Sequence, residues 1–382
     1  MDVLAQNEAW VHAPACAGPE SQKFRVGWGV TSRCNMGCSF CYSRDCRDEG
    51  EDIGFCDWAH FLDQSHLLVE SINYGTGENS LRPEWFDLVS LVRSSYPSIG
   101  QAVTTNGYLS QAARESTHAM RAIEQGIDEV DVSLDWAQRD DFCHFRGHSR
   151  AYDWVMETLA LCADLGKRTT IVLMGIAATL NPANLEGVFA VADKFHADVR
   201  INLYRPVSKP GRLAPPSLAQ VIRALDWISS NHRIREISDP LFSAVLTSDR
   251  TIADPSGISS IRILPNGKIC PSTYLVTSDF HLGSIRNLNP LAQLRQVPLM
   301  QTICLRQLPD ACADCSIRSR CLGGAIDRRF LWYGSLDERD PYCPLRDASA
   351  ENPRLRDYTV SPSGFQSIHD GYLPTMFFSP RE

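Results

Sequence analysis

The chain has 382 residues, which is long for a single domain and indicates a large domain with an extension. Hydrophobic residues make up 43% of it, enough for an ordinary core, and the formal net charge of −8 argues against a nucleic-acid-binding protein. No apolar run approaches the ~20 residues that cross a bilayer, and the first residues lack the features of a secretory signal. We therefore expect a cytoplasmic protein without a membrane or nucleic-acid partner, whose fourteen cysteines include metal ligands rather than disulfides.

The predicted elements alternate between strands and helices. Strands are expected at 24–30, 71–74, 101–105, 129–134, 168–176 and 199–204, and helices at 57–70, 83–96, 112–125, 152–165 and 182–195. Such alternation predicts an α/β fold with a parallel barrel, or part of one. A doubly wound open sheet has the same local pattern, so periodicity alone does not decide between the two.

Three cysteines directly follow the first predicted strand. Cys34, Cys38 and Cys41 are separated by three and then two residues. A [4Fe–4S] cluster takes four thiolates, so a set of three leaves one iron open to bind and reduce another molecule. Structural cysteines, or three ligands of a zinc site, are the alternatives.

This spacing, with the aromatic Phe40 before the third cysteine, resembles the signature of the radical S-adenosylmethionine (SAM) superfamily. The resemblance implies a partial (β/α)6 TIM-like barrel and a [4Fe–4S] cluster whose open iron is chelated by SAM. One electron from an external donor of the flavodoxin or ferredoxin type would then cleave SAM, and the 5′-deoxyadenosyl radical would abstract hydrogen from the substrate. The resemblance also implies that Phe40 lies against the adenine, and we place Tyr42 in the same cofactor site.

The turn after the second predicted strand resembles the family's element that binds the methionyl amine of SAM. Glycines let a ligand approach the backbone, and a carboxylate can hold an ammonium group. The turn differs from many relatives in a threonine at its second position, and a simple turn is the alternative interpretation. Its residues are Gly75, Thr76, Gly77 and Glu78.

Polar residues also end the third and fourth predicted strands, where parallel α/β folds place their reactive groups. These residues are Asn106, Ser133 and Asp135. The resemblance implies that they hydrogen-bond the ribose or carboxylate of SAM, whereas each alone also fits a helix cap.

Residues 142–147 resemble a loop of relatives that carry a peptide- or sugar-modifying extension. We expect Cys143 to be a candidate hydrogen donor, His144 a proton donor or acceptor, and Arg146 a clamp for a carboxylate. A structural role is the alternative for the histidine.

On the sixth predicted strand, Arg200, Asn202 and Tyr204 are two residues apart and share one face. We expect this face to line the barrel lumen and to contact SAM or substrate, with a self-contained internal polar network as the alternative. A carboxylated substrate would suit Arg146, Arg200 or Arg205.

A second cysteine group lies near the C-terminus. Cys312, Cys315, Cys321 and Cys343 form a complete ligand set for a second [4Fe–4S] cluster, although a four-cysteine zinc site has the same ligands. The pattern resembles the SPASM extension of radical SAM enzymes, which in its full form holds two auxiliary clusters. Cys270 matches a ligand of the other cluster, but two further ligand positions are Leu288 and Ala325, so we predict one auxiliary cluster, acting in electron transfer or structural support.

These patterns divide the chain into five predicted parts: an N-terminal segment (1–23), the partial barrel (24–210), a helical linker (211–257), a small SPASM-like domain (258–347) and a C-terminal tail packing on the barrel (348–382).

The substrate is predicted from what precedes the barrel. Many peptide-modifying members begin with a separate leader-binding domain, and the short segment before the first strand is too small for one. We therefore expect a small natural-product intermediate of the sugar, nucleoside or aminocyclitol type that is dehydrogenated, epimerised or decarboxylated. The alternatives are a ribosomal-peptide maturase that cross-links or epimerises its peptide with the help of a separate leader-binding protein, and a non-catalytic iron–sulfur scaffold.

Overall fold

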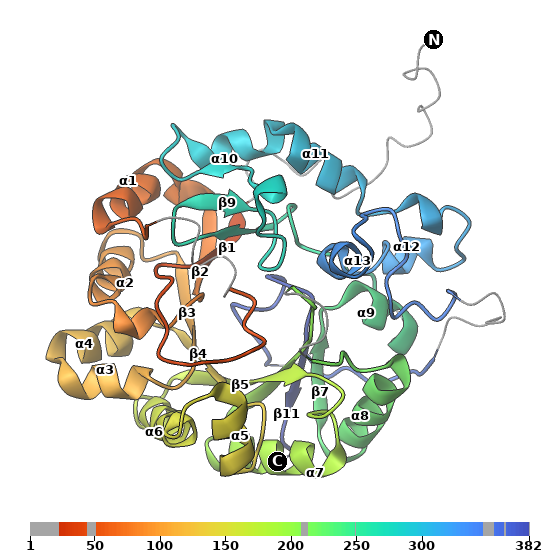
Figure 1. Cartoon of the computed structure of the whole chain (residues 1–382), viewed down its shortest axis with the longest axis horizontal. Coiled ribbons are helices and arrows are strands. Elements are labelled where there is room, and N and C mark those ends of the chain that lie inside the picture. The colour runs from red at the N-terminus through yellow and green to blue at the C-terminus, as the bar shows by residue number, and fades with distance from the viewer. Residues whose placement is uncertain are drawn as a thin grey trace.

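The computed structural model describes residues 23–43, 51–207, 213–248, 250–346, 355–362 and 364–381. The predicted N-terminal segment (1–23) lies outside these residues except for its last one. Figure 1 shows strands around the centre of the molecule and helices arranged around them on the outside.

The first six strands are parallel neighbours in one sheet. They are β1 (Phe24–Trp28), β2 (Val69–Tyr74), β3 (Gly100–Thr105), β4 (Glu129–Ser133), β5 (Arg168–Gly175) and β6 (Asp198–Leu203). The helices that follow them are α1 (Phe55–Ser65), α2 (Glu84–Ser95), α3 (Leu109–Glu115), α4 (Thr117–Gly126), α5 (Arg139–Arg146), α6 (Ala151–Asp164), α7 (Pro182–Lys194) and α8 (Leu218–Asn231). Because these helices lie on the outer side of the curved sheet, the prediction of a TIM-like α/β fold is confirmed (Figure 1).

Strands from the rest of the chain extend this sheet at both ends. The order is β10-β9-β8-β1-β2-β3-β4-β5-β6-β11-β7. Strand β8 (Ser260–Ile263) is parallel to β1, and β9 (Lys268–Cys270) and β10 (Gly283–Ser284) follow antiparallel, with Asn266 and Gly267 in the turn between β8 and β9. At the other end, β11 (Met376–Ser379) from the C-terminal tail lies antiparallel between β6 and β7 (Arg233–Ile237).

Three predicted elements differ in the structure. The helix predicted over 57–70 ends at Ser65, and Val69 already begins β2. The helix predicted over 112–125 is two helices, because Ser116 leaves the helical conformation and its side chain caps α4 by accepting a hydrogen bond from Ala119. The predicted loop over 142–147 is the last part of α5, which ends at Gly147 in the left-handed conformation (φ 68°) that glycine adopts at no steric cost.

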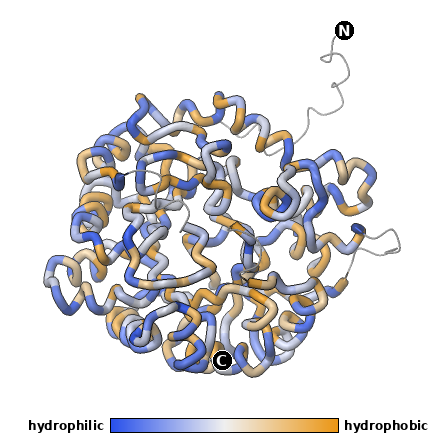
Figure 2. Tube along the Cα trace, viewed as in Figure 1, coloured by the Kyte–Doolittle hydropathy of each residue, from blue (hydrophilic) through white to orange (hydrophobic). Residues whose placement is uncertain are grey.

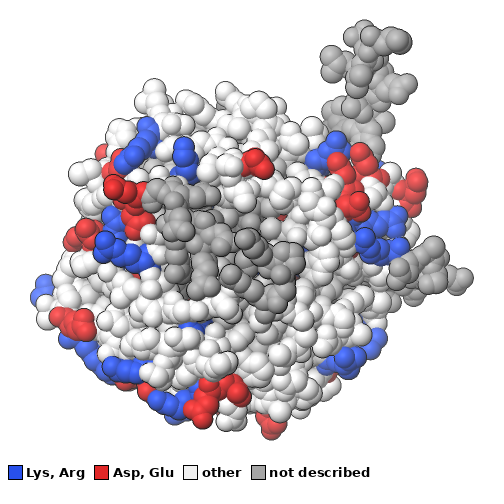
Figure 3. Space-filling model, viewed as in Figure 1, with Lys and Arg blue, Asp and Glu red and all other residues white. Residues whose placement is uncertain are grey.

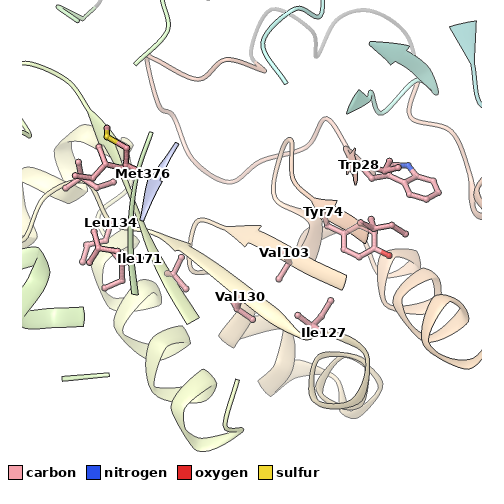
Figure 4. Close-up of a cluster of buried hydrophobic side chains, with 14 of the residues drawn as sticks. Trp28, Tyr74, Val103, Ile127, Val130, Leu134, Ile171 and Met376 are labelled. Carbon is pink, nitrogen blue, oxygen red and sulfur yellow. The ribbon is translucent and has the colours of Figure 1, made fainter. Parts of the chain in front are cut away.

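The main core lies between the sheet and the surrounding helices. Figure 4 shows part of it, with side chains from neighbouring strands such as Trp28, Tyr74, Val103 and Val130. All four are fully buried. Hydrophobic and hydrophilic residues alternate along the outer helices in Figure 2, as expected of helices that bury one face.

The C-terminal extension packs against the barrel through buried ion pairs. Its helices are α9 (Pro240–Leu246), α10 (Pro290–Gln293), α11 (Pro298–Leu305), α12 (Arg318–Cys321) and α13 (Ile326–Tyr333). On α13, Asp327 accepts a hydrogen bond from Arg205 at 2.9 Å, and Arg328 bridges Asp239 and Asp340 at 2.6 Å each. The segment 211–257, predicted as a helical linker, contains strand β7 as well as helices α8 and α9. The five domain boundaries stay a prediction.

Charged residues lie around the periphery of the face seen in Figure 3, with both signs side by side. None of the described helices is long and apolar enough to span a membrane.

Candidate active site

A cavity of about 220 Å³ lies in the barrel lumen, and it is lined by residues of the barrel, of the segment around β8 and β9, and of the C-terminal tail. Cys34, Cys38 and Cys41 line one part of it, next to the carboxyl ends of the strands. The tail residues His369 and Tyr372 line another part. The tail covers the opposite end of the barrel: its Ile368 packs against Gly100, the first residue of β3.

The structure brings the three predicted cluster ligands to this one cavity. Asn106 at the end of β3 donates hydrogen bonds to Cys34 Sγ at 3.6 Å and to Asn35 Oδ1 at 2.8 Å, which ties the cysteine loop to the barrel. Arg146 Nη1 lies 4.0 Å from Cys38 Sγ. Burial raises the pKa of the Cys38 thiol, and Arg146 opposes this rise.

The residues around the three thiols fit an iron–sulfur cluster and a polar ligand. Three soft thiol donors open onto the same cavity, as a cluster with one free iron requires. On β2, Asn73 also lines the cavity and is buried, yet neither its amide nitrogen nor its amide oxygen has a hydrogen-bond partner within the described chain. A bound molecule with donors and acceptors would satisfy them.

The Gly75–Glu78 turn packs directly on the cysteine loop. Thr76 and Gly77 both have positive φ values, 83° and 66°. A Cβ at Gly77 would lie 2.4 Å from the Arg33 carbonyl oxygen and 2.5 Å from that of Thr31, so only glycine fits. The backbone N–H of Glu78 donates to the same Arg33 oxygen at 2.8 Å.

The carboxylate of Glu78 does not line the cavity, contrary to its predicted contact with the amine of SAM. It is fully buried and accepts hydrogen bonds from Ser80 Oγ at 2.6 Å, Thr105 Oγ1 at 3.0 Å and the Asn106 backbone at 2.8 Å. Burial raises the pKa of Glu78 and these donors oppose the rise. Glu78 therefore holds the end of β3 against the turn, while Gly75, Thr76 and Gly77 line the cavity.

Phe40 and Tyr42 both line the cavity from the cysteine loop. The Phe40 ring stacks on Phe145 of α5, with centroids 4.3 Å apart. The Tyr42 hydroxyl lies 3.3 Å from Thr76 Oγ1 and 3.3 Å from Arg262 Nη2. Burial raises the pKa of Tyr42, so its phenol stays protonated and neutral near pH 7.

Ser133 and Asp135 at the end of β4 also line the cavity. Asp135 pairs with Arg146, whose Nη2 lies 2.5 Å from Oδ2, and its Oδ1 accepts a hydrogen bond from the Met174 backbone at 2.9 Å. Asp135 therefore orients Arg146 beside the cysteine loop.

The polar face of β6 points into the cavity, as the alternation predicts. Arg200, Asn202 and Tyr204 all line it. Each arginine that we considered for a carboxylated substrate has an acidic partner within the protein: Arg146 pairs with Asp135, Arg200 with Asp131 and Arg205 with Asp327. Part of the internal polar network that was the alternative therefore exists.

Cys143 and His144 do not reach the cavity, and their predicted catalytic roles are not supported. Both lie on α5, whose Phe142 points into the core while His144 is exposed. The Cys143 thiol donates to the Ser149 carbonyl oxygen at 3.2 Å, outside the lumen. Neighbouring helical residues point in different directions, so the inward position of Arg146 does not place these two residues inside.

Sequence reasoning missed several cavity residues from the extension and tail: Arg262, Thr273, Tyr274, His369, Tyr372 and Leu373. Arg262 on β8 donates to the Gly75 carbonyl oxygen at 2.6 Å and contacts Thr76, so the extension holds the Gly75–Glu78 turn in place. The local pattern of 260–263 is typical of a strand, but it does not indicate that this strand pairs with β1, which the structure shows.

The second cysteine group lies in the extension. Burial raises the pKa of Cys312 to about 11, and Cys315 and Cys343 add to the rise because their charges lie nearby. Burial, Asp340, Cys312 and Cys343 raise the pKa of Cys321. Burial also raises the pKa of Cys343, and a positively charged metal centre would favour the thiolate form of such buried thiols. The positions predicted to have lost their ligands differ in exposure: Leu288 is largely exposed and Ala325 is buried.

A parallel barrel whose first strand leads into three thiols on a central cavity defines a class of iron–sulfur enzymes. Residues 28–181 match the family model of the Radical SAM superfamily. Residues 28–181 thus form a radical SAM domain, and the predicted resemblance to this superfamily is confirmed.

Relatives match far beyond this domain. The mycofactocin maturase MftC of Mycobacterium ulcerans (strain Agy99) is 23% identical over 353 residues, covering 89% of this chain and 90% of the relative. Among solved structures, Streptococcus suis SuiB bound to S-adenosylmethionine has a TM-score of 0.66 at 18% identity, over 85% of this chain and 78% of SuiB. Native anSMEcpe with bound AdoMet and Cp18Cys peptide has a TM-score of 0.64 at 16% identity, over 83% and 93% of the two chains. At these identities the structural likeness shows a shared fold.

These findings contradict the expected small-molecule substrate. The curated relative is named a maturase, and the similar solved structures include anSMEcpe with a peptide and SuiB bound to its precursor peptide SuiA. The wrong step was to read a short N-terminal segment as evidence against a peptide substrate. MftC matches this chain over 90% of its own length, so a maturase can have nearly the same extent.

Proposed function

We propose that the chain is a peptide maturase that uses SAM-derived radical chemistry to cross-link or epimerise a ribosomally made peptide. The observation that carries this proposal is the Cys34, Cys38 and Cys41 set on the cavity, in a chain similar to a maturase over 89% of its length. A separate leader-binding protein and an external one-electron donor would be its partners, in a cytoplasmic, reducing setting.

In this proposal the cavity residues bind and shield the cofactors. Cys34, Cys38 and Cys41 would hold a [4Fe–4S] cluster, which supplies the electron that cleaves SAM when both are bound. Around SAM, Phe40 would face the adenine, and Thr76, Asn106, Ser133 and Asp135 would offer hydrogen bonds. Tyr42 would close the cavity wall beside Thr76.

Substrate would meet the part of the cavity formed by β6 and Arg146. Arg200 and Tyr204 line this part, and the tail residues Tyr372 and Leu373 close it against water. Exclusion of water protects a reactive radical from side reactions. Arg146 would orient a substrate oxygen while Asp135 holds its guanidinium in place.

We also propose that Cys312, Cys315, Cys321 and Cys343 hold one auxiliary [4Fe–4S] cluster. A cluster with four thiolates has no open iron, so its role would be electron transfer or structural support rather than substrate binding. Its position next to α13 connects it to the cavity through the Asp327–Arg205 pair.

The test is anaerobic incubation of the reduced, iron-reconstituted protein with SAM and the short peptide encoded beside its gene. We expect a mass change on the peptide and formation of 5′-deoxyadenosine, and loss of both in Cys38→Ala. Genes nearby that encode no short peptide, or a peptide that stays unmodified while SAM is cleaved, would contradict the proposed substrate.

A further inference from the structure

The C-terminal tail brings His369, which lines the cavity, to two buried carboxylates behind the cavity wall. Among the described residues, Glu129, Asp131 and His369 are the group of acidic and histidine side chains whose ligand atoms lie within 4.8 Å of one another. All three are buried. Glu129 and Asp131 lie two residues apart on β4, so both point into the lumen, as does Ser133.

The contacts around His369 fix how its ring is oriented. Nδ1 lies 3.1 Å from Asp131 Oδ2 and 3.4 Å from Glu129 Oε1. Nε2 faces Thr104 Oγ1 at 3.4 Å, and both Thr104 and His369 line the cavity. Burial raises the pKa of Asp131 and Arg200 opposes this rise, whereas the pKa of Glu129 is lowered. Because an ionised Glu129 only accepts hydrogen bonds, the proton of the neutral ring belongs on Nδ1. Nε2 then carries the lone pair, on the side of the ring that faces Thr104 Oγ1 and the cavity lining.

Glu129 is itself held rigidly. It accepts hydrogen bonds from Ser367 Oγ at 2.5 Å and from the Ile368 backbone at 2.8 Å. Burial alone would raise the pKa of Glu129, but hydrogen bonds from His369 and Ser367 bring it below its usual value. An ionised Glu129 stabilises a positive charge on the ring of His369.

Arg200 gives an independent sign that a ligand occupies this end of the cavity. Its guanidinium forms an ion pair with Asp131 through Nη2. The side chain is 98% buried and lines the cavity, yet its Nε and Nη1 have no hydrogen-bond partner within the described chain. A buried guanidinium with unused donors is costly unless an oxygen acceptor comes from a bound molecule.

A divalent cation at this cluster fits the contacts less well. Arg200 already pairs with Asp131, and Arg168 lies 3.8 Å from Glu129. Two nearby guanidinium groups repel a cation, and hydrogen-bond donors already occupy both oxygens of Glu129.

We propose that His369 is a catalytic proton acceptor for the substrate, with Glu129 and Asp131 as positioning residues and Arg200 as the group that binds a substrate oxygen next to it. The inference rests on the proposed peptide-modifying function. In the proton transfer, an O–H or N–H bond of the substrate breaks and leaves its electron pair on the substrate. The proton forms a bond with Nε2, and Glu129 and Asp131 stabilise the imidazolium.

The test compares His369→Asn with wild-type holoenzyme on the precursor peptide encoded beside the gene. Asparagine keeps a donor to the carboxylates but has no acceptor at the Nε2 position. We expect product formation to fall about 100-fold, the usual weight of general acid–base catalysis, while 5′-deoxyadenosine formation and iron content stay within about twofold. The matched control is His118→Asn, because His118 also pairs with a carboxylate, Asp87 at 2.8 Å, but on the exposed surface.

The pH profile separates catalysis from a structural role. The groups that face His369 are Glu129 and Asp131 from β4 and Tyr372 from its own loop, with Arg168 and Arg200 behind the carboxylates. The dependence of product formation on pH should therefore differ between wild type and His369→Asn. If His369→Asn does not fold, His369→Gln serves in its place, because its amide fills the Nε2 position but cannot take up a proton.

Each outcome decides the proposal. Unchanged product formation or an unchanged pH profile in the variant would overturn it while leaving the proposed function in place. One divalent cation per chain, present in wild type and absent in the variant, would also overturn it in favour of a metal site. No peptide product from wild type would overturn the proposed function, and this proposal with it.

Discussion

The turn Gly75–Glu78 needs a glycine at position 77 because its backbone packs closely on the cysteine loop. Gly77 has its Cα against two carbonyl oxygens of the loop that carries Cys34, and the Glu78 carboxylate holds the turn to β3. Sequence reasoning identified the turn as part of the site but assigned the wrong task to Glu78. Spacing shows that a carboxylate is near a strand end, whereas its direction depends on donors at Thr105 and Asn106 from another strand.

Replacing this glycine tests the packing. We expect Gly77→Ala to lower the free energy of unfolding by about 2 kcal/mol, from the positive φ and the collision with Arg33 and Thr31, and to reduce iron loading. Thermal unfolding and iron analysis measure both effects. Gly54→Ala is the control, since its Cβ would meet nothing within 4 Å and its φ is −97°, and it should change neither. Equal behaviour of the two variants would refute the packing argument.

A partly buried acid at the start of β6, Asp198, gives a pH-dependent prediction. Burial raises the pKa of Asp198 to about 6, with Glu129 adding to the rise and Arg235 opposing it. The acid is protonated more readily in the folded state, so it costs stability as pH rises from about 4 to about 6, and the full cost remains above that range.

We therefore expect Asp198→Asn to raise the free energy of unfolding by about 2 kcal/mol at pH 7.5 and to leave it unchanged near pH 4. Denaturant unfolding at a series of pH values measures the difference. A constant difference across this range would show that the charge of Asp198 is not its cause.

At the scale of elements, the alternation of strands and helices predicted the barrel well because each βα unit is local. It failed where a distant segment completes the sheet. Strand β11 pairs with β6 and β7, about 140 residues or more earlier in the chain, and nothing in a local pattern indicates that partner. The aromatic tail was predicted only to pack on the barrel, yet Phe377 and Phe378 lie inside its sheet.

The contribution of β11 can be measured at Phe378, which is fully buried and pairs with Val199 and Ile234. We expect Phe378→Ala to lower the free energy of unfolding by about 4 kcal/mol, the usual cost of such a truncation in a core. Leu67→Ala, at a side chain that is 74% exposed, should change it by less than about 0.5 kcal/mol. A small effect at Phe378 would show that the tail strand adds little to the fold.

At the scale of the whole molecule, three distant parts of the chain build one cavity. The barrel supplies the cysteine loop and the strand ends, the extension supplies Arg262 and Tyr274, and the tail supplies His369 and Tyr372. The cysteine spacing alone predicted the radical SAM site because its ligands are contiguous in sequence. The substrate class could not be predicted in that way, since the residues that face the substrate come from parts of the chain joined only by folding.

The proposed auxiliary cluster predicts the iron content of the whole molecule. Reconstituted protein should contain about eight irons per chain, and the double variant Cys312→Ala and Cys315→Ala should lose about half of them. Iron and zinc analysis of both proteins measures this. About four irons with one zinc would instead assign the second cysteine group to a zinc site.

The most direct measurement of the central claim is hydrogen transfer from peptide to SAM-derived product. The reduced holoenzyme is incubated anaerobically with SAM and a uniformly deuterated form of the precursor peptide, and the 5′-deoxyadenosine is analysed by mass spectrometry. We predict one deuterium atom in the 5′-deoxyadenosine together with a modified peptide. Deuterium-free 5′-deoxyadenosine beside an unmodified peptide would contradict the assignment of this chain as a radical SAM peptide maturase.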